Sequence, residues 1–329
     1  MKFSFLICTR NSERVLSEVL NSIINQTDEE RNFEVIVVDY KSTDRTMEIA
    51  RKILFEANVQ LIEISCALSG KSPALILGLN AAKGDFIVVV DDDNILFPNY
   101  INEAKELAKN NQIGCIGAMG IIDQNLKLPI WFKQYEGIYA IGLPSSLKPV
   151  DSVWGAAALI NKKAWQDLTS SGYALELNPA RESHSAPIAI GGEDGELSCA
   201  IRMLGYEVFY SEKLKFVHKF EQKRLSIDYM LKNSFGSSRA VPLIDIYRVK
   251  IHYERFLLPF LLWNFICFKR LVGCAIRAVM YRVKGDSMSS IFHITRARAF
   301  LMGYIETILH FNRIYGNLGR IKKLAVKQN

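Results

Sequence analysis

Three consecutive carboxylates end the apolar run in the stretch VVVDDDNILFP, where Asp91, Asp92 and Asp93 follow residues typical of a buried strand. Burying an unpaired carboxylate costs several kcal/mol, so we expect the cluster to lie at the strand's end and to meet a cation. That cation is either a basic side chain or a divalent ion, because an Asp-x-Asp pair can hold an ion whose other ligands are substrate phosphates. A solvated turn that caps a helix is the alternative, and this motif alone does not decide between them.

Two further sites carry residue types that do chemistry. Glu193 and Asp194 follow two glycines in GGEDGELSCAIRMLG and begin a predicted helix, where simple capping near the positive end of the helix dipole is the default interpretation. His218 in LKFVHKFE is the third candidate, although a lone histidine is more often a surface or core residue than a ligand. Only the combination of the three sites indicates catalysis.

The elements around these residues predict an open, mostly parallel sheet. Apolar runs at 2–9 and 33–40 are typical of buried strands, and the segment 12–26 between them places its apolar residues on one helical face, with Ser12 as the expected N-cap. Strands that alternate with helices in this way favour a doubly wound α/β fold. Ligands bind such sheets at the carboxyl ends of the strands, so Asp39 and the three aspartates are expected to share one crevice.

The pattern becomes mixed from about residue 110 onward. Residues 112–122, 150–161 and 206–211 are predicted to be further strands, and Gly205 is expected to end the helix that starts at the second acidic site. The segment 172–192 is rich in Gly, Pro and Ser and shows no period, which is typical of a functional lid or a disordered loop.

Charge is distributed unevenly along the 329 residues. Residues 239–329 carry 16 Lys/Arg and 4 Asp/Glu, whereas the preceding 238 residues carry 25 and 30. Basic tails usually meet phosphate, on nucleic acid or on an anionic membrane surface. The six cysteines form no CxxC pair and lie mostly in apolar runs, so we expect reduced core residues in a cytosolic protein and no zinc site.

The basic tail also contains an aromatic and apolar segment. Its unbroken apolar run from Phe256 is about 13 residues long, and Pro259, Lys269 and Arg270 interrupt the pattern. Because a bilayer span needs roughly 20 residues, we expect the segment to lie in the membrane interface. The N-terminal apolar run is shorter than a signal-peptide core. These features predict a cytoplasmic protein that is peripheral on the inner face of the cell membrane, with contact between copies of the chain as another use of the tail.

The order of the motifs resembles the inverting family 2 glycosyltransferases of the GT-A fold, of the bacterial polysaccharide type. The resemblance is carried by CTRN, VVDYKSTDRT, SGKSPALILGLNAAKGDFIVVVDDDN and GGEDGELSCAIRMLGYEVFYSEKLKFVH, within residues 1–220. It implies a GT-A type sheet over residues 1–238, with a nucleotide-sugar half to about residue 110 and an acceptor half after it. Residues 239–329 would then form a helical, basic and aromatic C-terminal region.

The resemblance also implies roles for individual residues. Asp194 would be the catalytic base, with Glu193 as the second candidate, and Asp93 with His218 would hold Mn²⁺ or Mg²⁺ at the diphosphate. The residues that would contact the nucleotide sugar are Thr9, Arg10, Asp39, Lys71, Asp91 and Asp92. Trp154 and Trp131 are candidates for stacking on an acceptor sugar, although core packing explains either of them equally well.

These residue types suit an inverting transfer, which needs a base for the acceptor hydroxyl and a cation for the departing diphosphate. The expected reaction moves a hexosyl or N-acetylhexosaminyl group from a nucleotide sugar, with UDP-sugar as the first choice. Its acceptor would be a glycan or a lipid-linked saccharide in surface polysaccharide synthesis. After the second strand the family usually has two acids, a small residue and Ser, whereas Tyr40 and Lys41 follow Asp39 here, which leaves the nucleotide open.

Two other functions compete with this prediction. A sugar-1-phosphate nucleotidyltransferase uses a related sheet but needs a Gly-rich phosphate loop after the first strand, and CTRNSERV has no glycine. A non-catalytic protein that binds a membrane surface or nucleic acid would explain the basic tail. We recognise no nucleic-acid module in the sequence, so no nucleic-acid partner is expected.

Overall fold

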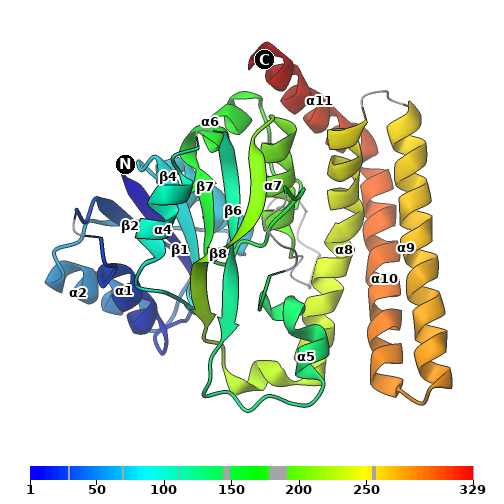
Figure 1. Ribbon diagram of the computed structural model, residues 1–329, viewed down its shortest axis with the longest axis horizontal. Helices are drawn as coiled ribbons and strands as arrows, with labels where there is room; N and C mark the ends of the chain where they lie inside the picture. The colour runs from blue at the N-terminus through cyan, green and yellow to red at the C-terminus, as the bar shows by residue number, and fades with distance from the viewer. Residues whose placement is uncertain are drawn as a thin grey trace.

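The computed structural model describes residues 1–28, 30–68, 70–110, 112–143, 149–177, 191–253 and 257–328. An α/β body forms the N-terminal part of the chain, and a group of long helices follows it (Figure 1). Most of the loop predicted over 172–192 lies outside the described residues.

The body contains one sheet, which in the described part of the chain has eight strands in the order β3-β2-β1-β4-β7-β6-β8-β5. The strands are β1 (Phe3–Thr9), β2 (Phe33–Asp39), β3 (Leu61–Ser65), β4 (Phe86–Asp91), β5 (Asn94–Leu96), β6 (Ile113–Ile122), β7 (Ala158–Asn161) and β8 (Glu207–His218). Strands β3, β2, β1 and β4 are mutually parallel, and β6 is parallel to β8. Only β7 and β5 run antiparallel to their neighbours, so the predicted mostly parallel sheet is confirmed.

Helices cover both faces of this sheet because its central strands are apolar on both sides. In β1, Leu6 packs in the same cluster as Leu75 of α3 (Lys71–Ala81), whereas the adjacent Phe5 packs with Leu20 of α1 (Leu16–Ile24). Alternate side chains of a strand point to opposite faces, so a continuous apolar run requires cover on each. The remaining helices of the body are α2 (Thr46–Glu56), α4 (Tyr100–Leu107), α5 (Phe132–Tyr135), α6 (Lys162–Ser170) and α7 (Glu193–Met203).

Two details of the predicted body are wrong. Ser12 is not the N-cap of α1, which begins at Leu16, because the Ser12 hydroxyl turns instead toward Asp92. The strand predicted over 150–161 is confined to β7 at its end, since the preceding residues leave the sheet and approach α7.

The register of the parallel strands brings the expected site residues to one edge. Thr9 lies opposite Asp39 across β1 and β2, and Cys8 lies opposite Asp91 across β1 and β4. The loops after β1 and β2 are also tied together, because the Asn11 side chain accepts a hydrogen bond of 2.8 Å from the Thr43 N–H. The carboxyl ends of three strands therefore form one surface.

The C-terminal region consists of α8 (Ile227–His252), α9 (Leu257–Val283), α10 (Ser287–Leu309) and α11 (Phe311–Gln328), and α10 lies between α8 and α9 (Figure 1). The close crossing of α10 and α8 requires a glycine, since a Cβ on Gly303 would lie 1.8 Å from the Arg239 carbonyl oxygen. The indole N–H of Trp263 in α9 donates to the Pro242 carbonyl at 2.9 Å. The domain boundary predicted at residue 238 falls within α8, because a change in charge along a sequence does not mark the end of a helix.

The residues that interrupt the apolar pattern of the tail do not interrupt its helix. Pro259 lies in the first turn of α9, where a missing N–H costs no helical hydrogen bond, and the helix continues through Lys269 and Arg270. Among the described helices, the stretch Pro259–Val283 is long and apolar enough to cross a membrane by length and composition. A core helix of a soluble protein can have the same length and composition.

A buried carboxylate joins α7 to α8 and to the segment before the undescribed loop. Glu196 of α7 accepts hydrogen bonds from the Tyr247 hydroxyl at 2.9 Å, the Tyr173 hydroxyl at 3.2 Å, and the N–H groups of Glu176 and Leu177 at 2.8 and 2.7 Å. Because these donors come from α8 and from the segment 173–177, the carboxylate on α7 joins three parts of the chain and holds the helical region against the body.

We predict that Glu196→Ala lowers the free energy of unfolding by about 3 kcal/mol or more, because it leaves several buried donors without an acceptor. Urea unfolding followed by circular dichroism measures the change. The matched control is Glu48→Ala on the exposed face of α2, which should change stability by less than about 0.5 kcal/mol. Equal unfolding midpoints for the two variants would contradict the role given to Glu196.

Candidate active site

A cleft of about 510 Å³ opens between the carboxyl edge of the sheet and the helices α7, α8 and α10. Both acidic motifs and the candidate histidine contribute to its lining, although they are far apart in the sequence. The polar residues that line it include Lys71, Asp91, Glu193, Asp194, His218 and Arg224. The structure therefore brings the three predicted sites into one cavity.

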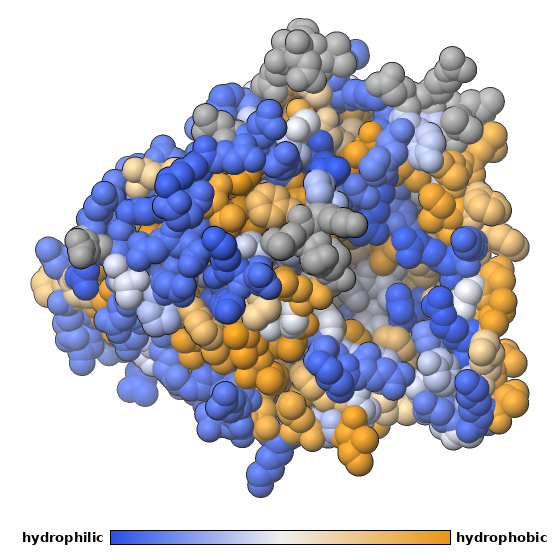
Figure 2. Space-filling model, in the orientation of Figure 1, coloured by the Kyte–Doolittle hydropathy of each residue, from blue (hydrophilic) through white to orange (hydrophobic). Residues whose placement is uncertain are grey.

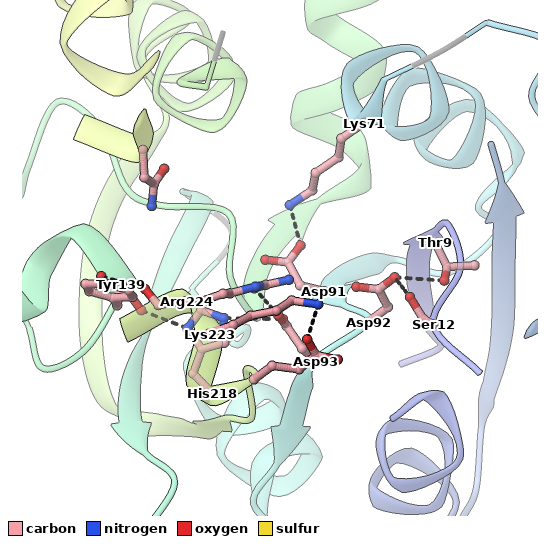
Figure 3. A network of polar contacts seen from close by, with 12 residues as sticks. Thr9, Ser12, Lys71, Asp91, Asp92, Asp93, Tyr139, His218, Lys223 and Arg224 are labelled. Carbon is pink, nitrogen blue, oxygen red and sulfur yellow. Dashed lines mark hydrogen bonds and ion pairs between the residues drawn. The ribbon is translucent and has the colours of Figure 1, made fainter. Parts of the chain in front are cut away.

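The three consecutive aspartates point to three different partners (Figure 3). Asp91, the last residue of β4, forms an ion pair with the ammonium group of Lys71. Asp92 accepts hydrogen bonds from the Thr9 hydroxyl at 2.8 Å and from the Ser12 hydroxyl. Burial raises the pKa of Asp92, and these two hydroxyls oppose that shift.

Asp93 is the most buried of the three and faces two basic side chains. Its Oδ1 lies 3.3 Å from Nε2 of His218, and its Oδ2 accepts a hydrogen bond of 2.7 Å from Arg224. Burial by itself would raise the pKa of Asp93, but His218 and Arg224 lower it to about 2. The other ring nitrogen of His218 lies 2.7 Å from the Tyr139 carbonyl, which orients the imidazole toward the carboxylate. Asp93 is therefore ionised at neutral pH.

Lys71 connects the two acidic motifs. It is the first residue of α3 and follows Gly70, whose φ of 112° suits a glycine. Burial would lower the pKa of Lys71, but the charges of Asp91 and Glu193 raise it well above its ordinary value. The ammonium group thus stays charged between the two sets of carboxylates.

Asp194 is held by backbone donors at the start of α7. Its Oδ2 accepts a hydrogen bond of 2.6 Å from the Gly155 N–H and its Oδ1 one of 2.7 Å from the Gly195 N–H. Burial raises the pKa of Asp194, while Lys71 and these two donors oppose the shift. Burial and the charge of Asp194 raise the pKa of Glu193 to about 7. The two backbone donors favour the ionised form of Asp194 and leave it able to accept a proton.

The structure separates the two tryptophans proposed as acceptor contacts. Trp154 lines the cleft, and its orientation is set by a hydrogen bond of 2.9 Å from its indole N–H to the Ala118 carbonyl. Trp131 is not among the described residues that line the cleft, and its ring instead packs against Phe132 and Tyr135 with centroids 6.4 Å apart. An aromatic residue is common both in cores and at sugar sites, so residue type could not tell these two positions apart.

The residues predicted to contact the nucleotide lie at the same edge of the sheet. Asp39 accepts a hydrogen bond of 3.0 Å from the Ser42 N–H, and Thr9 contacts Asp92. Arg10 is exposed and forms no ion pair with another described residue, so its guanidinium is available to an anion. Tyr40 lies near Asp92, whose charge adds to burial in raising the pKa of the phenol to about 12.

Sequence reasoning missed three residues of this site. Arg224 lies in the 3₁₀ helix Gln222–Leu225 and reaches Asp93 only because the chain folds back after β8. Ser12 was assigned to a helix cap. Gly155 has no side chain to signal a function, yet it is needed here, because a Cβ on it would lie 3.1 Å from the Cβ of Asp194.

The donor set at Asp93 fits a divalent ion only when a substrate completes it. One carboxylate oxygen and one imidazole nitrogen converge there, and no group of three or more His, Cys, Asp or Glu among the described residues could hold an ion. Mg²⁺ and Mn²⁺ sites in enzymes commonly use one or two protein ligands together with substrate phosphates. Asp93 and His218 match that arrangement.

Comparison with known proteins supports the same assignment. The family model "Glycosyl transferase family 2" matches residues 4–169, which is half of the chain. The poly(ribitol-phosphate) β-N-acetylglucosaminyltransferase TarS of Staphylococcus aureus is 33% identical over 147 residues, which make up 45% of this chain but only 23% of TarS. The matched region thus spans less than a quarter of that relative.

Solved structures share the fold at low sequence identity. The mannosyltransferase PcManGT of Pyrobaculum calidifontis, solved with GDP-Man and Mn²⁺, has a TM-score of 0.57 and 15% identity, covering 100% of this chain and 86% of its own. The structure of S. aureus TarS residues 1–349 in complex with UDP-GlcNAc has a TM-score of 0.50 and 17% sequence identity. That match covers 95% of this chain and 92% of the TarS chain. The expected GT-A fold is thereby confirmed. Taken with the family match, the chain belongs to glycosyl transferase family 2.

Proposed function

We propose that this enzyme transfers a hexosyl or N-acetylhexosaminyl group from a UDP-sugar with inversion, assisted by Mn²⁺ or Mg²⁺. The observation that carries the proposal is the placement of an oriented base, Asp194, in the same cleft as the Asp93–His218 pair. The TarS structure contains UDP-GlcNAc, which favours UDP as the nucleotide. The PcManGT structure contains GDP-Man, so GDP is the other candidate.

Each residue of the cleft has a role in the proposed transfer. Asp194 takes the proton of the acceptor hydroxyl as that oxygen bonds to the anomeric carbon and the bond from that carbon to the diphosphate breaks. No second carboxylate acts as a nucleophile, so the anomeric configuration inverts. Lys71 and Arg224 place positive charge where the diphosphate leaves. A metal held by Asp93 and His218 would neutralise further charge on that leaving group.

The alternative enzyme class has little support in this cleft. A nucleotidyltransferase requires backbone N–H groups of a glycine-rich loop around a triphosphate, whereas β1 here ends at Thr9 and is followed by Arg10, Asn11 and Ser12. The proposed acceptor is a glycan, a polyol polymer or a lipid-linked saccharide of surface polysaccharide synthesis. TarS, whose name specifies poly(ribitol-phosphate), is consistent with that class.

We also propose that the enzyme rests on the inner membrane surface through α9 and α10. Apolar side chains of α9 recur every three or four residues on its exposed face, which forms an orange edge in Figure 2. These residues are Leu261, Phe265, Phe268, Val272, Ile276, Val279 and Val283. Exposed cations such as Arg282 and Lys284 flank the face, and a basic amphipathic surface of this kind suits an anionic lipid interface.

The base assignment predicts that Asp194→Asn retains binding of the nucleotide sugar but slows transfer by about 10²–10⁴-fold or more, because amides do not accept the acceptor's proton. Release of the nucleoside diphosphate measures transfer, and calorimetry measures binding. Glu193→Gln is the matched control and should lose less activity. If Asp194→Asn kept its turnover while Glu193→Gln lost it, the base would be Glu193.

The metal assignment predicts that UDP binds at least tenfold more tightly with Mn²⁺ than with EDTA, and that Asp93→Ala abolishes this difference. Calorimetric titration with a panel of nucleoside diphosphates gives both the affinity and the preferred base. Glu48→Ala, outside the cleft, should behave as the parent enzyme. Equal affinity in Mn²⁺ and EDTA for every nucleotide would remove the metal from the mechanism.

The membrane proposal predicts that the full-length enzyme floats with anionic vesicles and that Phe265→Ser combined with Phe268→Ser reduces the floating fraction several-fold. Phe55→Ser is the matched control, because Phe55 is 87% exposed on α2 in the α/β body. Failure of the unaltered enzyme to float would overturn the proposal. Self-association without vesicle binding, seen by light scattering, would assign the face to a contact between copies of the chain.

A further inference from the structure

A second hollow, of about 350 Å³, lies among the helices α8, α9 and α10 outside the sheet. Four basic residues contribute to its lining, which we name the basic groove: Lys269, Arg270 and Arg277 of α9 and Arg296 of α10. None of the described residues that line it is acidic. The same lining includes apolar side chains, among them Ile266 and Phe300.

Most of this positive charge is not neutralised within the described protein. Arg270 is paired, since its Nε lies 2.6 Å from the buried Asp245 carboxylate. Lys269, Arg277 and Arg296 form no ion pair with any described residue. Burial lowers the pKa of the adjacent His293, and the charges of Arg296 and Arg277 lower it further. Like charges gathered in one hollow repel each other, and an anion bound between them would offset this repulsion.

The basic groove adjoins the catalytic cleft. Ser238, Val241 and Arg296 line both hollows. The cleft already has its own charges for the donor diphosphate, which are Lys71 and Arg224. The cations of the groove are therefore left for a different anion, on a molecule that reaches the cleft from the helical side.

We propose that the basic groove binds a phosphate group of the acceptor while the acceptor hydroxyl lies at Asp194. This inference rests on the proposed function for the identity of the ligand as acceptor, but not for phosphate binding itself. Guanidinium and ammonium groups together provide the donors that a phosphate monoester or diester requires. The phosphate belongs either to a lipid headgroup, entering along the apolar face of α9, or to a soluble phosphate-containing polymer.

The test measures phosphate binding without donor or turnover. Calorimetry with EDTA present compares glycerol 3-phosphate and monomeric dodecyl phosphate as probes of the full-length enzyme. The groove variant is Lys269→Gln combined with Arg277→Gln, and the matched control is Lys52→Gln combined with Lys109→Gln, which removes two exposed charges of the α/β body that do not line the groove. Thermal melting confirms that both variants are folded.

We expect the groove variant to bind the probes at least tenfold more weakly than the parent, and the control variant to bind them equally well. A preference for dodecyl phosphate over glycerol 3-phosphate identifies a lipid source, and similar affinities identify a soluble one. Equal losses in the two variants, or no binding by the parent enzyme, would overturn the proposal.

Two further measurements distinguish failure of this inference from failure of the proposed function. Asp194→Asn should retain phosphate binding, whatever its effect on transfer. In the active enzyme, the groove variant should raise KM for a phosphate-bearing acceptor at least tenfold without changing donor affinity. An unchanged acceptor KM alongside weakened phosphate binding would show that the groove binds phosphate that is not part of the acceptor, and would overturn the assignment.

Discussion

The free-energy cost of placing carboxylates at the edge of an apolar sheet determines which residues surround this site. Strands β1, β2 and β4 are buried along most of their length, so the charges that follow them can lie only at their carboxyl ends. Each of the three aspartates then requires a partner, and the partners come from different elements. Lys71 is at the start of α3, Thr9 is the last residue of β1, Ser12 follows β1, and His218 ends β8. Satisfying these charges is what brings distant segments of the chain together.

A second acidic pair meets the same requirement in a different way. Asp194 is stabilised by the charge of the nearby Lys71 and by backbone N–H groups, and it forms no direct ion pair with another described residue. Backbone donors hold a carboxylate in place while leaving it free to receive a proton. Asp93, in contrast, is paired with two cationic side chains that keep its pKa near 2. The two acids have opposite electrostatic environments, and this difference separates a candidate base from a candidate metal ligand.

The C-terminal helices belong to the same electrostatic arrangement. Helix α8 contacts α7 on one side and α10 on the other, so it forms a wall of the cleft and also a wall of the helical group. The buried Glu196 and its hydrogen bonds to Tyr173 and Tyr247 fix that connection. The mildly acidic body forms the sheet side of the cleft, and the basic helices are placed beside it. The uneven charge of the sequence is distributed in space as well as along the chain.

The amino-acid sequence by itself determined the mostly parallel sheet and located its first strands along the chain, because long apolar runs with alternating helical segments leave few other ways to bury them. It also identified both acidic motifs and His218, whose residue types are rare next to apolar strands. The partners were decided only by tertiary structure. Arg224 reaches Asp93 and Gly155 lies against Asp194 only because the chain folds back on itself. Ser12 contacts Asp92 and does not cap a helix. The spacing of apolar residues predicts which helix or strand a residue belongs to. The partner of a buried charge depends on contacts between helices and strands that are distant in the sequence, and local spacing does not predict these contacts.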